Sequence, residues 1–370
     1  MSDARCYARR SSQRNGAVGD LPSPALIAIF IAAAVVTWVA GILLSRTTDA
    51  LDLRLGLGEA LGGVVLLAIS GSLPELAITV SAVLQGHLDV AAGNLIGGIA
   101  IQTMVLVLCD RAVGGDKPLT YLVGSLIPVL EGAMVVIVVA VMLMGTILPE
   151  STAIAGVSPA SLGIVATWLV GIFLIDRVRR HQPWQVTMPG SQRGRPHRRM
   201  PHATAPKPFA KASTVQIALL FGAASAAILV AGVALESSGS LLADRSGING
   251  IVFGATFLAA ASALPEISTG IEAVRLGDNE LAIGDIFGGN AFQLCLFVLA
   301  DFLAGKPLLP TAGRENAWLG ALGIVLTGIY VSAIIVRGER RHAGLGSDSL
   351  TAVVVFALGL WGLTIIVGSG

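Results

Sequence analysis

The chain has very few charged residues for its length. Only 13% of its 370 residues are Asp, Glu, Lys or Arg, while 54% are hydrophobic, and the mean hydropathy is +0.80. A soluble domain carries about a quarter charged residues, so this composition excludes a soluble globular fold. The long apolar runs indicate a polytopic membrane protein instead.

Cysteine and histidine are also scarce, which argues against two kinds of site. The three cysteines, Cys6, Cys109 and Cys295, show no metal-ligand spacing, and the last two lie in apolar runs, so no disulfide framework is expected. All five histidines fall outside the predicted membrane spans, and the sequence has no His-Glu-x-x-His motif. We therefore do not expect an enzyme.

Ten segments are apolar and long enough to cross a bilayer, which takes about 20 helical residues. We predict an all-α membrane protein with a basic N-terminal tail (1–24), a first five-helix half (25–175), a hydrophilic linker (176–213) and a second five-helix half (214–370). The predicted spans are 25–45, 56–84, 88–109, 119–144, 159–175, 214–235, 248–274, 280–303, 317–336 and 350–367.

The linker holds nine of the 24 Lys and Arg residues and a single acidic residue, and its composition predicts little fixed structure. Basic loops of membrane proteins stay in the cytoplasm, so we predict a cell-membrane protein with a cytoplasmic linker and external termini. This orientation places 17 of the 24 Lys and Arg residues inside, although the basic N-terminal tail opposes it. A nucleic-acid or regulatory patch is the alternative for the linker; the positive-inside interpretation is favoured, and no nucleic acid is expected.

Two stretches of the chain are versions of each other. Residues 67–108 align without a gap to residues 258–299 at a constant offset of 191, and 16 of the 42 positions are identical. Because each half has an odd number of predicted spans, the second half should insert upside down relative to the first. Inverted repeats bring their matching ends together near mid-membrane, so Glu75 and Glu266 should face each other.

Each repeat combines a proline with a carboxylate inside an apolar span. Pro74 and Pro265 lack an N–H and clash with the carbonyl four residues back, so each should break its helix. Hydrocarbon cannot satisfy the freed carbonyl groups. Glu75 and Glu266 follow directly, and an ionisable residue inside a membrane points to function. Carbonyl and carboxylate oxygens together are the ligands of a hard cation such as Ca²⁺.

Each repeat also places polar and small residues on one helical face, at positions i, i+4 and i+8. These residues are Asn94, Gly98 and Gln102 in the first repeat and Asp285, Gly289 and Gln293 in the second. The glutamines could supply ligands or bond neighbouring helices, and the glycines could serve packing alone. Asp285 could be a third charge or line an aqueous path. Glu131, which has no repeat partner, could carry a proton, act as a counter-ion between helices or lie near a membrane surface.

The paired motifs resemble the alpha-repeats of the calcium/cation antiporter superfamily, the sodium/calcium exchangers. GSLPE followed by GNLIGGIAIQ, and SALPE followed by GDIFGGNAFQ, are similar to the family pattern G-T-S-L-P-E with G-N-x-x-G-S-N-x-x-N. The resemblance implies a protein that exchanges Ca²⁺ for Na⁺ by alternating access, with broken helices at the central site and Glu75 and Glu266 as the Ca²⁺ carboxylates. The other implied metal-site residues are Ala68, Gly71, Ser72, Gln102, Ala259, Ser262 and Gln293.

The same resemblance implies no permanently bound cofactor. The partners would be the transported inorganic cations, Ca²⁺ with Na⁺ or H⁺, and the lipid bilayer. It leaves the oligomeric state open, although the family fold is complete in one chain, so a monomer would suffice.

The motifs depart from the family pattern where hydroxyl groups are expected. Gly71 replaces the Thr of the first motif, and Gly98 and Gly289 replace the Ser of the second. The missing hydroxyls weaken Na⁺ as the coupling ion more than they weaken Ca²⁺ binding. Exchange of Ca²⁺ for H⁺ is therefore the alternative, because two close carboxylates titrate as a coupled pair. An intramembrane enzyme and a channel are less favoured, since no catalytic constellation is present and broken inverted repeats suit alternating access.

Overall fold

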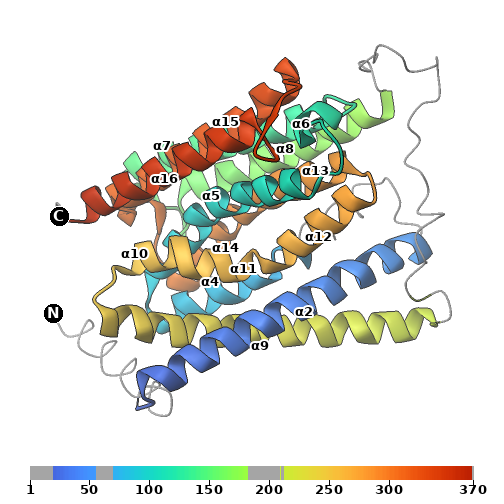
Figure 1. The fold of residues 1–370 in the computed structure, drawn as a ribbon. Coiled ribbons are helices and arrows are strands. Elements are labelled where there is room, and N and C mark those ends of the chain that lie inside the picture. Colours follow the sequence, from blue (N-terminus) through green and yellow to red (C-terminus); the bar gives the residue numbers. More distant parts are fainter. Residues whose placement is uncertain (1–19, 56–69, 182–208, 210–211, 369–370) are drawn as a thin grey trace, which may run out of the picture.

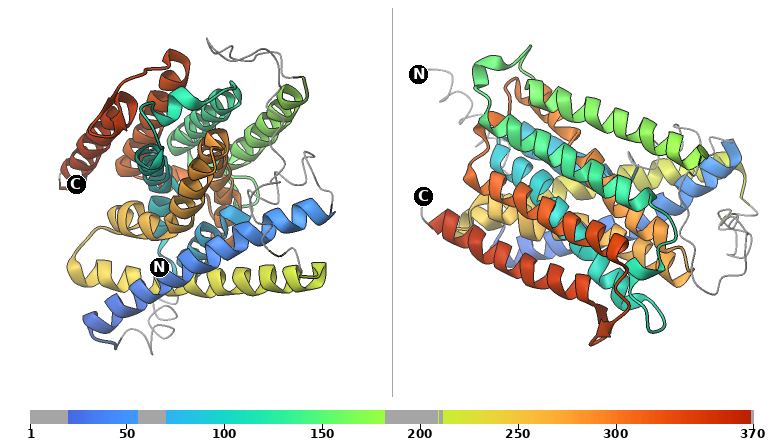
Figure 2. Two further views of the ribbon diagram at one scale, coloured as in Figure 1. Left: turned by 45° about the vertical axis from the view of Figure 1, so that its right-hand side comes forward. Right: turned by 90° about the horizontal axis from the view of Figure 1, so that it is seen from above.

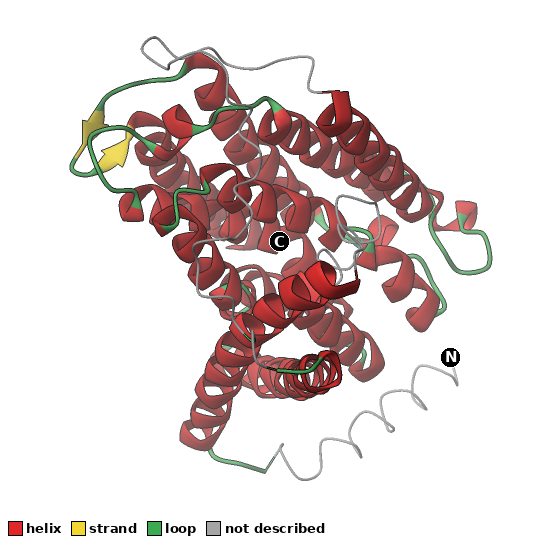
Figure 3. Ribbon diagram, turned by 90° about the vertical axis from the view of Figure 1, so that its right-hand side faces the viewer, coloured by secondary structure: helices red, strands yellow, loops and turns green. Residues whose placement is uncertain are grey.

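The computed structural model describes residues 20–55, 70–181, 209 and 212–368, and these residues form a helical bundle (Figure 1). A short antiparallel hairpin, β1 (Arg341–His342) with β2 (Leu345–Gly346), precedes the last helix (Figure 3). The helices are α2 (Ser23–Leu55), α4 (Leu73–Gln85), α5 (Leu88–Ala112), α6 (Leu119–Leu122), α7 (Ile127–Ile147), η1 (Glu150–Thr152), α8 (Pro159–His181), α9 (Thr214–Ser246), α10 (Gly250–Phe253), the π-helix η2 (Gly254–Leu258), α11 (Ala259–Ser262), α12 (Leu264–Arg275), α13 (Asn279–Gln293), α14 (Leu296–Ala304), η3 (Leu309–Thr311), α15 (Arg314–Val336) and α16 (Ser347–Gly368).

The predicted all-α membrane architecture is confirmed. In the described residues, eight helices are long and apolar enough to cross a membrane, and a ninth candidate is the bent segment from Gly250 to Arg275. The apolar windows of α2, α9 and α16 are only 28%, 28% and 17% buried inside the protein, so most of their side chains face outwards, where lipid would lie. The count of ten spans stays a prediction, because part of the predicted span 56–84 lies outside the described residues.

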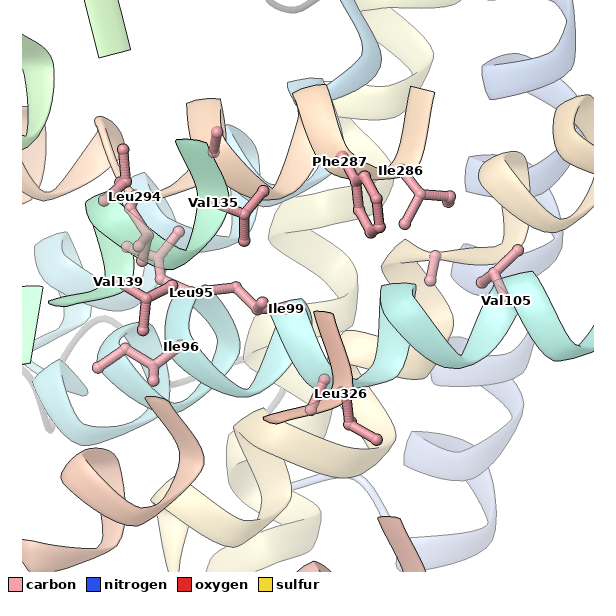
Figure 4. Close-up of a cluster of buried hydrophobic side chains, with 14 of the residues drawn as sticks. Leu95, Ile96, Ile99, Val105, Val135, Val139, Ile286, Phe287, Leu294 and Leu326 are labelled. Carbon is pink, nitrogen blue, oxygen red and sulfur yellow. The ribbon is translucent and has the colours of Figure 1, made fainter. Parts of the chain in front are cut away.

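The interior of the bundle is organised around α5, whose apolar window is 83% buried. Figure 4 shows Leu95, Ile96 and Ile99 of α5 among side chains from α7, α13 and α15. Helices in lipid associate through close packing and not through exclusion of water, so small residues at the contacts matter. Gly93 of α5 is such a residue, because a Cβ there would lie 2.6 Å from the carbonyl oxygen of Ile251.

Helices α2 and α9 form an antiparallel pair on one face of the bundle (Figures 1 and 2). At one end, Arg54 donates to the carbonyl oxygen of Phe209 (3.0 Å), close to the linker; at the other end, Arg245 donates to the carbonyl oxygen of Leu21 (2.7 Å). We call these two ends the linker side and the far side. Each helix has 33 residues and is about 50 Å long, so it must tilt in, or extend beyond, a hydrocarbon layer about 30 Å thick.

Two buried aspartates tie the two halves of the chain together. Asp110, at the end of α5, accepts a hydrogen bond from the backbone N–H of Gly346 (2.7 Å), just before α16. Asp301, in α14, accepts one from the backbone N–H of Ser158 (3.0 Å), just before α8. The two aspartates are themselves separated by 191 residues. Each half therefore holds the start of the last helix of the other half, while the inverted orientation of the halves stays a prediction.

The boundary of the linker differs from the sequence prediction. Helix α8 continues to His181, so the prediction of little fixed structure is wrong for residues 176–181. The extra turn is stabilised because Arg179 reaches back to the buried carboxylate of Glu131, with 2.8 Å between Nη2 and Oε1. Most of the remaining linker, like the N-terminal tail up to residue 19, lies outside the described residues.

We expect the substitution Asp301→Ala to destabilise the protein by about 2–4 kcal/mol, because it leaves buried backbone N–H groups without their charged acceptor. The measurement is the apparent melting temperature in detergent. Asp116→Ala, which removes an exposed aspartate, is the matched control and should leave the melting temperature unchanged. Equal melting temperatures for the two variants would show that Asp301 does not hold the halves together.

Candidate functional site

The predicted helix break is present at Pro265. The segment from Gly250 to Ser262 and helix α12 (Leu264–Arg275) meet at an angle of 46°, and Pro265 lies in the first turn of α12. In the first repeat, Pro74 likewise lies in the first turn of α4 (Leu73–Gln85). Proline suits a first turn because the N–H it lacks has no partner inside the helix there.

The two glutamates stand at the start of these two short helices. Glu75 is in the first turn of α4 and Glu266 in the first turn of α12, where the helix dipole favours negative charge. The carboxylate of Glu75 is only 1% exposed and accepts a hydrogen bond from Nε2 of Gln102 (3.0 Å). It also interacts with the side chain of Ser262, from the other repeat. Glu75 and Glu266 lie close enough for their charges to interact.

Several buried oxygen atoms of the two glutamates and of the polar repeat positions have no protein partner. Among the described residues, no hydrogen-bond donor reaches Oε2 of Glu75, Oε2 of Glu266, Oδ1 of Asn94 or Oε1 of Gln293. A buried polar atom left in this way costs about 1–3 kcal/mol. A set of oxygens with two carboxylates among them is what a hard divalent cation binds.

A cavity leads to this region between α2 and the broken helices. Its lining includes Glu266, Asp285 and Thr269 from the second repeat, and Thr269 donates a hydrogen bond to Oδ2 of Asp285 (3.3 Å). Asp285 therefore lies on the wall of this cavity, close enough to Glu266 for the two charges to interact. The other lining residues are Gly41, Ser45, Ser70, Gly71, Pro74, Ile228 and Pro265.

Only some of the remaining predicted site residues line the cavity. Gly71 does so. Ser72, directly before α4, and Ala259, the first residue of α11, are buried. Gln102 donates to Glu75, whereas Gln293, its repeat partner, donates to the backbone carbonyl of Leu95 (2.6 Å). The side-chain amides of these two glutamines therefore have different partners in the two repeats. Ala68 lies outside the described residues.

The Gly-rich faces of the two repeats also differ. A Cβ at Gly97 would overlap the Cα and Cβ atoms of Ala255, and one at Gly98 would overlap the amide of Gln293. At Gly288 and Gly289 a Cβ would meet no heavy atom within 4 Å. Close packing therefore explains the glycines of the first repeat but not those of the second.

Glu131 lies in α7 and packs against Gly284 of α13. Its ion pair with Arg179 joins α7 to α8, which favours the counter-ion interpretation over a proton carrier.

Two glycines that the sequence comparison missed bring α2 and α9 against the broken helices. A Cβ at Gly41 of α2 would lie 2.6 Å from Cβ of Pro265, and one at Gly232 of α9 would lie 3.4 Å from the carbonyl oxygen of Pro74. The two glycines are again 191 residues apart. Extending the alignment beyond the 42 positions of high similarity would have found them.

Comparison with known proteins identifies relatives over almost the whole chain. The family model described as "Sodium/calcium exchanger protein" matches residues 25–175 and 216–364. The inner membrane protein YrbG of Escherichia coli (strain K12) is 25% identical over 294 residues, which cover 79% of this chain and 82% of that protein.

Solved structures share the fold at low sequence identity. The H⁺/Ca²⁺ exchanger CAX superposes with a TM-score of 0.62 at 14% identity, covering 92% of this chain and 86% of that one. The sodium-calcium exchanger NCX_Mj superposes with a TM-score of 0.55 at 14% identity, covering 93% of this chain and 99% of that one. These similarities confirm the fold of a polytopic exchanger.

We expect Gly97→Ala to destabilise the protein by about 2 kcal/mol or more, because the new methyl group meets backbone atoms of Ala255 and forces the helices apart. Its repeat partner gives the control: Gly288→Ala has space for the methyl group and gains about 1 kcal/mol of helix propensity. Thermal unfolding in detergent compares the two. The packing interpretation would fail if Gly97→Ala were as stable as Gly288→Ala.

Proposed function

Since the chain belongs to the sodium/calcium exchanger protein family, we propose that it is a secondary antiporter that exchanges Ca²⁺ for a monovalent cation by alternating access. The exchanger fold it shares with known transporters and the absence of a catalytic motif in the sequence support a transporter and not an enzyme. It needs no resident cofactor, because the cations are its cargo.

The observation that carries this proposal is the pair of glutamates contributed by opposite halves. Glu75 and Glu266 each begin a short helix, and each keeps one carboxylate oxygen free of protein donors. Two anions side by side in an apolar interior are costly, and a divalent cation between them would cancel their charge. We assign Glu75 and Glu266 as the Ca²⁺ carboxylates.

We further propose that oxygens near the two proline breaks complete the shell. Gly71 and Ser72 precede Pro74, and Ala259 and Ser262 precede Pro265; as the family resemblance implies, their backbone or hydroxyl oxygens would serve. Ala68 belongs to the same proposed set, as do the amides of Gln102 and Gln293.

The proton is the monovalent ion that the geometry supports best. Gln102 is engaged by Glu75, and Gln293 donates to the carbonyls of Asn94 and Leu95. Gly71 and Gly98 contribute no side-chain oxygen. The hydroxyls that the family pattern offers to Na⁺ are thus missing at these positions, whereas a carboxylate pair can bind and release protons as a unit. Na⁺ remains the second candidate, because hydroxyls such as Thr269 line the cavity.

The proposed orientation follows the positive-inside rule. The linker would lie in the cytoplasm, both termini outside, and the cavity beside Glu266 would open to the cytoplasm. The membrane would be the cell or inner membrane, as for YrbG. Both glutamates come from one chain, so a monomer would hold a complete site.

The test is uptake of radiolabelled Ca²⁺ into proteoliposomes under an outward H⁺ gradient and, separately, an outward Na⁺ gradient. We expect H⁺ to drive uptake, and we expect Glu75→Gln or Glu266→Gln to reduce it to the level of protein-free vesicles, because either change leaves a single buried charge for a divalent ion. Glu150→Gln, which alters an exposed glutamate, is the control and should transport normally.

Uptake driven by Na⁺ alone would reverse the assignment of the coupling ion and leave the glutamate pair in place. If neither gradient drove Ca²⁺ uptake, or if both glutamate variants transported normally, the proposed exchange at this site would be wrong.

A further inference from the structure

We propose that Glu236 of α9, together with Ser81, Gln85 and His87, is the latch that holds the protein closed on the far side of the membrane. We call these four residues the far-side latch. The proposal rests on the transport cycle proposed above, because a latch has a role only where access alternates.

The side chain of Glu236 is fully buried and receives donors from two other elements. Oε2 accepts from the hydroxyl of Ser81 (2.7 Å) and from the amide of Gln85, both near the end of α4. Oε1 lies 2.7 Å from Nδ1 of His87, in the turn between α4 and α5, and accepts from Ser240 of α9 itself (2.9 Å). One carboxylate thus joins α9 to the end of α4, the helix that carries Glu75 in its first turn.

The repeat shows what this position does in the other half. Glu236 corresponds to Ser45 at the offset of 191, and Ser45 lines the cavity beside Glu266. The place that lines a cavity in one half is therefore occupied by a hydrogen-bonded carboxylate in the other half. This difference makes the far side the more tightly closed of the two.

The linker side has its own contact at the matching position. Ser81 corresponds to Glu272, and Glu272 pairs with Arg46 of α2 at 3.0 Å. That pair is about half exposed, with 48% and 51% of the two side chains accessible, so water and salt weaken it. Glu236 is shielded from water and its hydrogen bonds are charge-assisted, which makes them the stronger set. The imbalance between the two contacts favours closure on the far side.

The far-side latch can still open, because Glu236 would be hydrated as soon as α9 moves away from α4. The hydrogen bonds lost from Ser81 and Gln85 would be replaced by hydrogen bonds from water. Two such alternative arrangements of one packed contact are what a two-state gate needs.

His87 makes the far-side latch sensitive to pH. The titratable groups that face it are Glu236 and Asp244 of α9 and Asp89 of α5, and the hydrogen bond to Glu236 raises the pKa of His87 above its ordinary value. A raised pKa in the closed state stabilises that state below the ordinary pKa of about 6.5, and this stabilisation is lost as the pH rises through the raised value. Alkaline conditions on the far side should therefore favour opening.

The experiment uses a single cysteine at Thr79, a fully buried position one turn beyond Glu75, in a full-length chain without its native cysteines. Its labelling by a membrane-impermeant maleimide, added to intact cells, reports opening on the far side. A cysteine at the exposed Thr152 of η1 serves as the reference for far-side access and for the pH dependence of the labelling reaction itself.

We expect Glu236→Ala to raise the relative labelling rate at Thr79 by about tenfold or more, since several charge-assisted hydrogen bonds are lost. Glu236→Gln, which keeps the size of the side chain, should raise it less and serves if the alanine variant does not fold. Glu272→Gln, the matched change on the linker side, should not raise it. In the parent the relative rate should increase with pH, and His87→Gln should abolish this increase.

Unchanged labelling in a folded Glu236 variant would overturn the far-side latch, and an intact pH response in His87→Gln would remove His87 from it. The readout needs no transported ion, so it stands whether or not Ca²⁺ uptake is observed. A failure of the latch and a failure of the proposed exchange are therefore distinguishable.

Discussion

A helix that is interrupted inside a membrane leaves polar backbone groups that hydrocarbon cannot satisfy. The structure depends on how that constraint is met. Pro265 interrupts one span with a 46° bend, and protein packs around the interruption except where the cavity meets it: α2 crosses it at Gly41, and α5 packs along the segment before it. Because the break is sheltered in this way, carboxylates and free oxygens can be kept beside it.

The reciprocal contacts between the halves follow from the same constraint. Asp110 and Asp301 satisfy backbone N–H groups at the starts of α16 and α8, and each does so for the half to which it does not belong. Gly41 and Gly232 likewise bring the first helix of each half onto the break of the other. Each half thus contributes packing around the proline break of the other, so the candidate site requires both halves.

Much of the candidate site was predictable from the sequence because the same residues occur in both repeats. The apolar composition indicates a membrane protein, and a proline followed by a glutamate inside an apolar span, present twice, indicates a helix break beside a functional carboxylate. Glu236 was not predictable in this way, because its partner at the same offset is Ser45, and a difference between repeats looks like divergence until the cavity is seen. The direction of Gln293 was also beyond the sequence: it depends on Gly98, which leaves the space into which the amide turns.

The exchange of contacts between halves also bears on how the protein is made. Ser158 enters the membrane with the first half, but the carboxylate that accepts its N–H belongs to Asp301, 143 residues later in the chain. During synthesis the start of α8 must therefore wait for this acceptor until most of the second half has been inserted, although the ion pair between Arg179 and Glu131 already joins α8 to α7. A ribosome that stalls in between would leave a half-finished membrane protein as a substrate for quality-control proteases. The two halves therefore depend on each other during synthesis as well as in function.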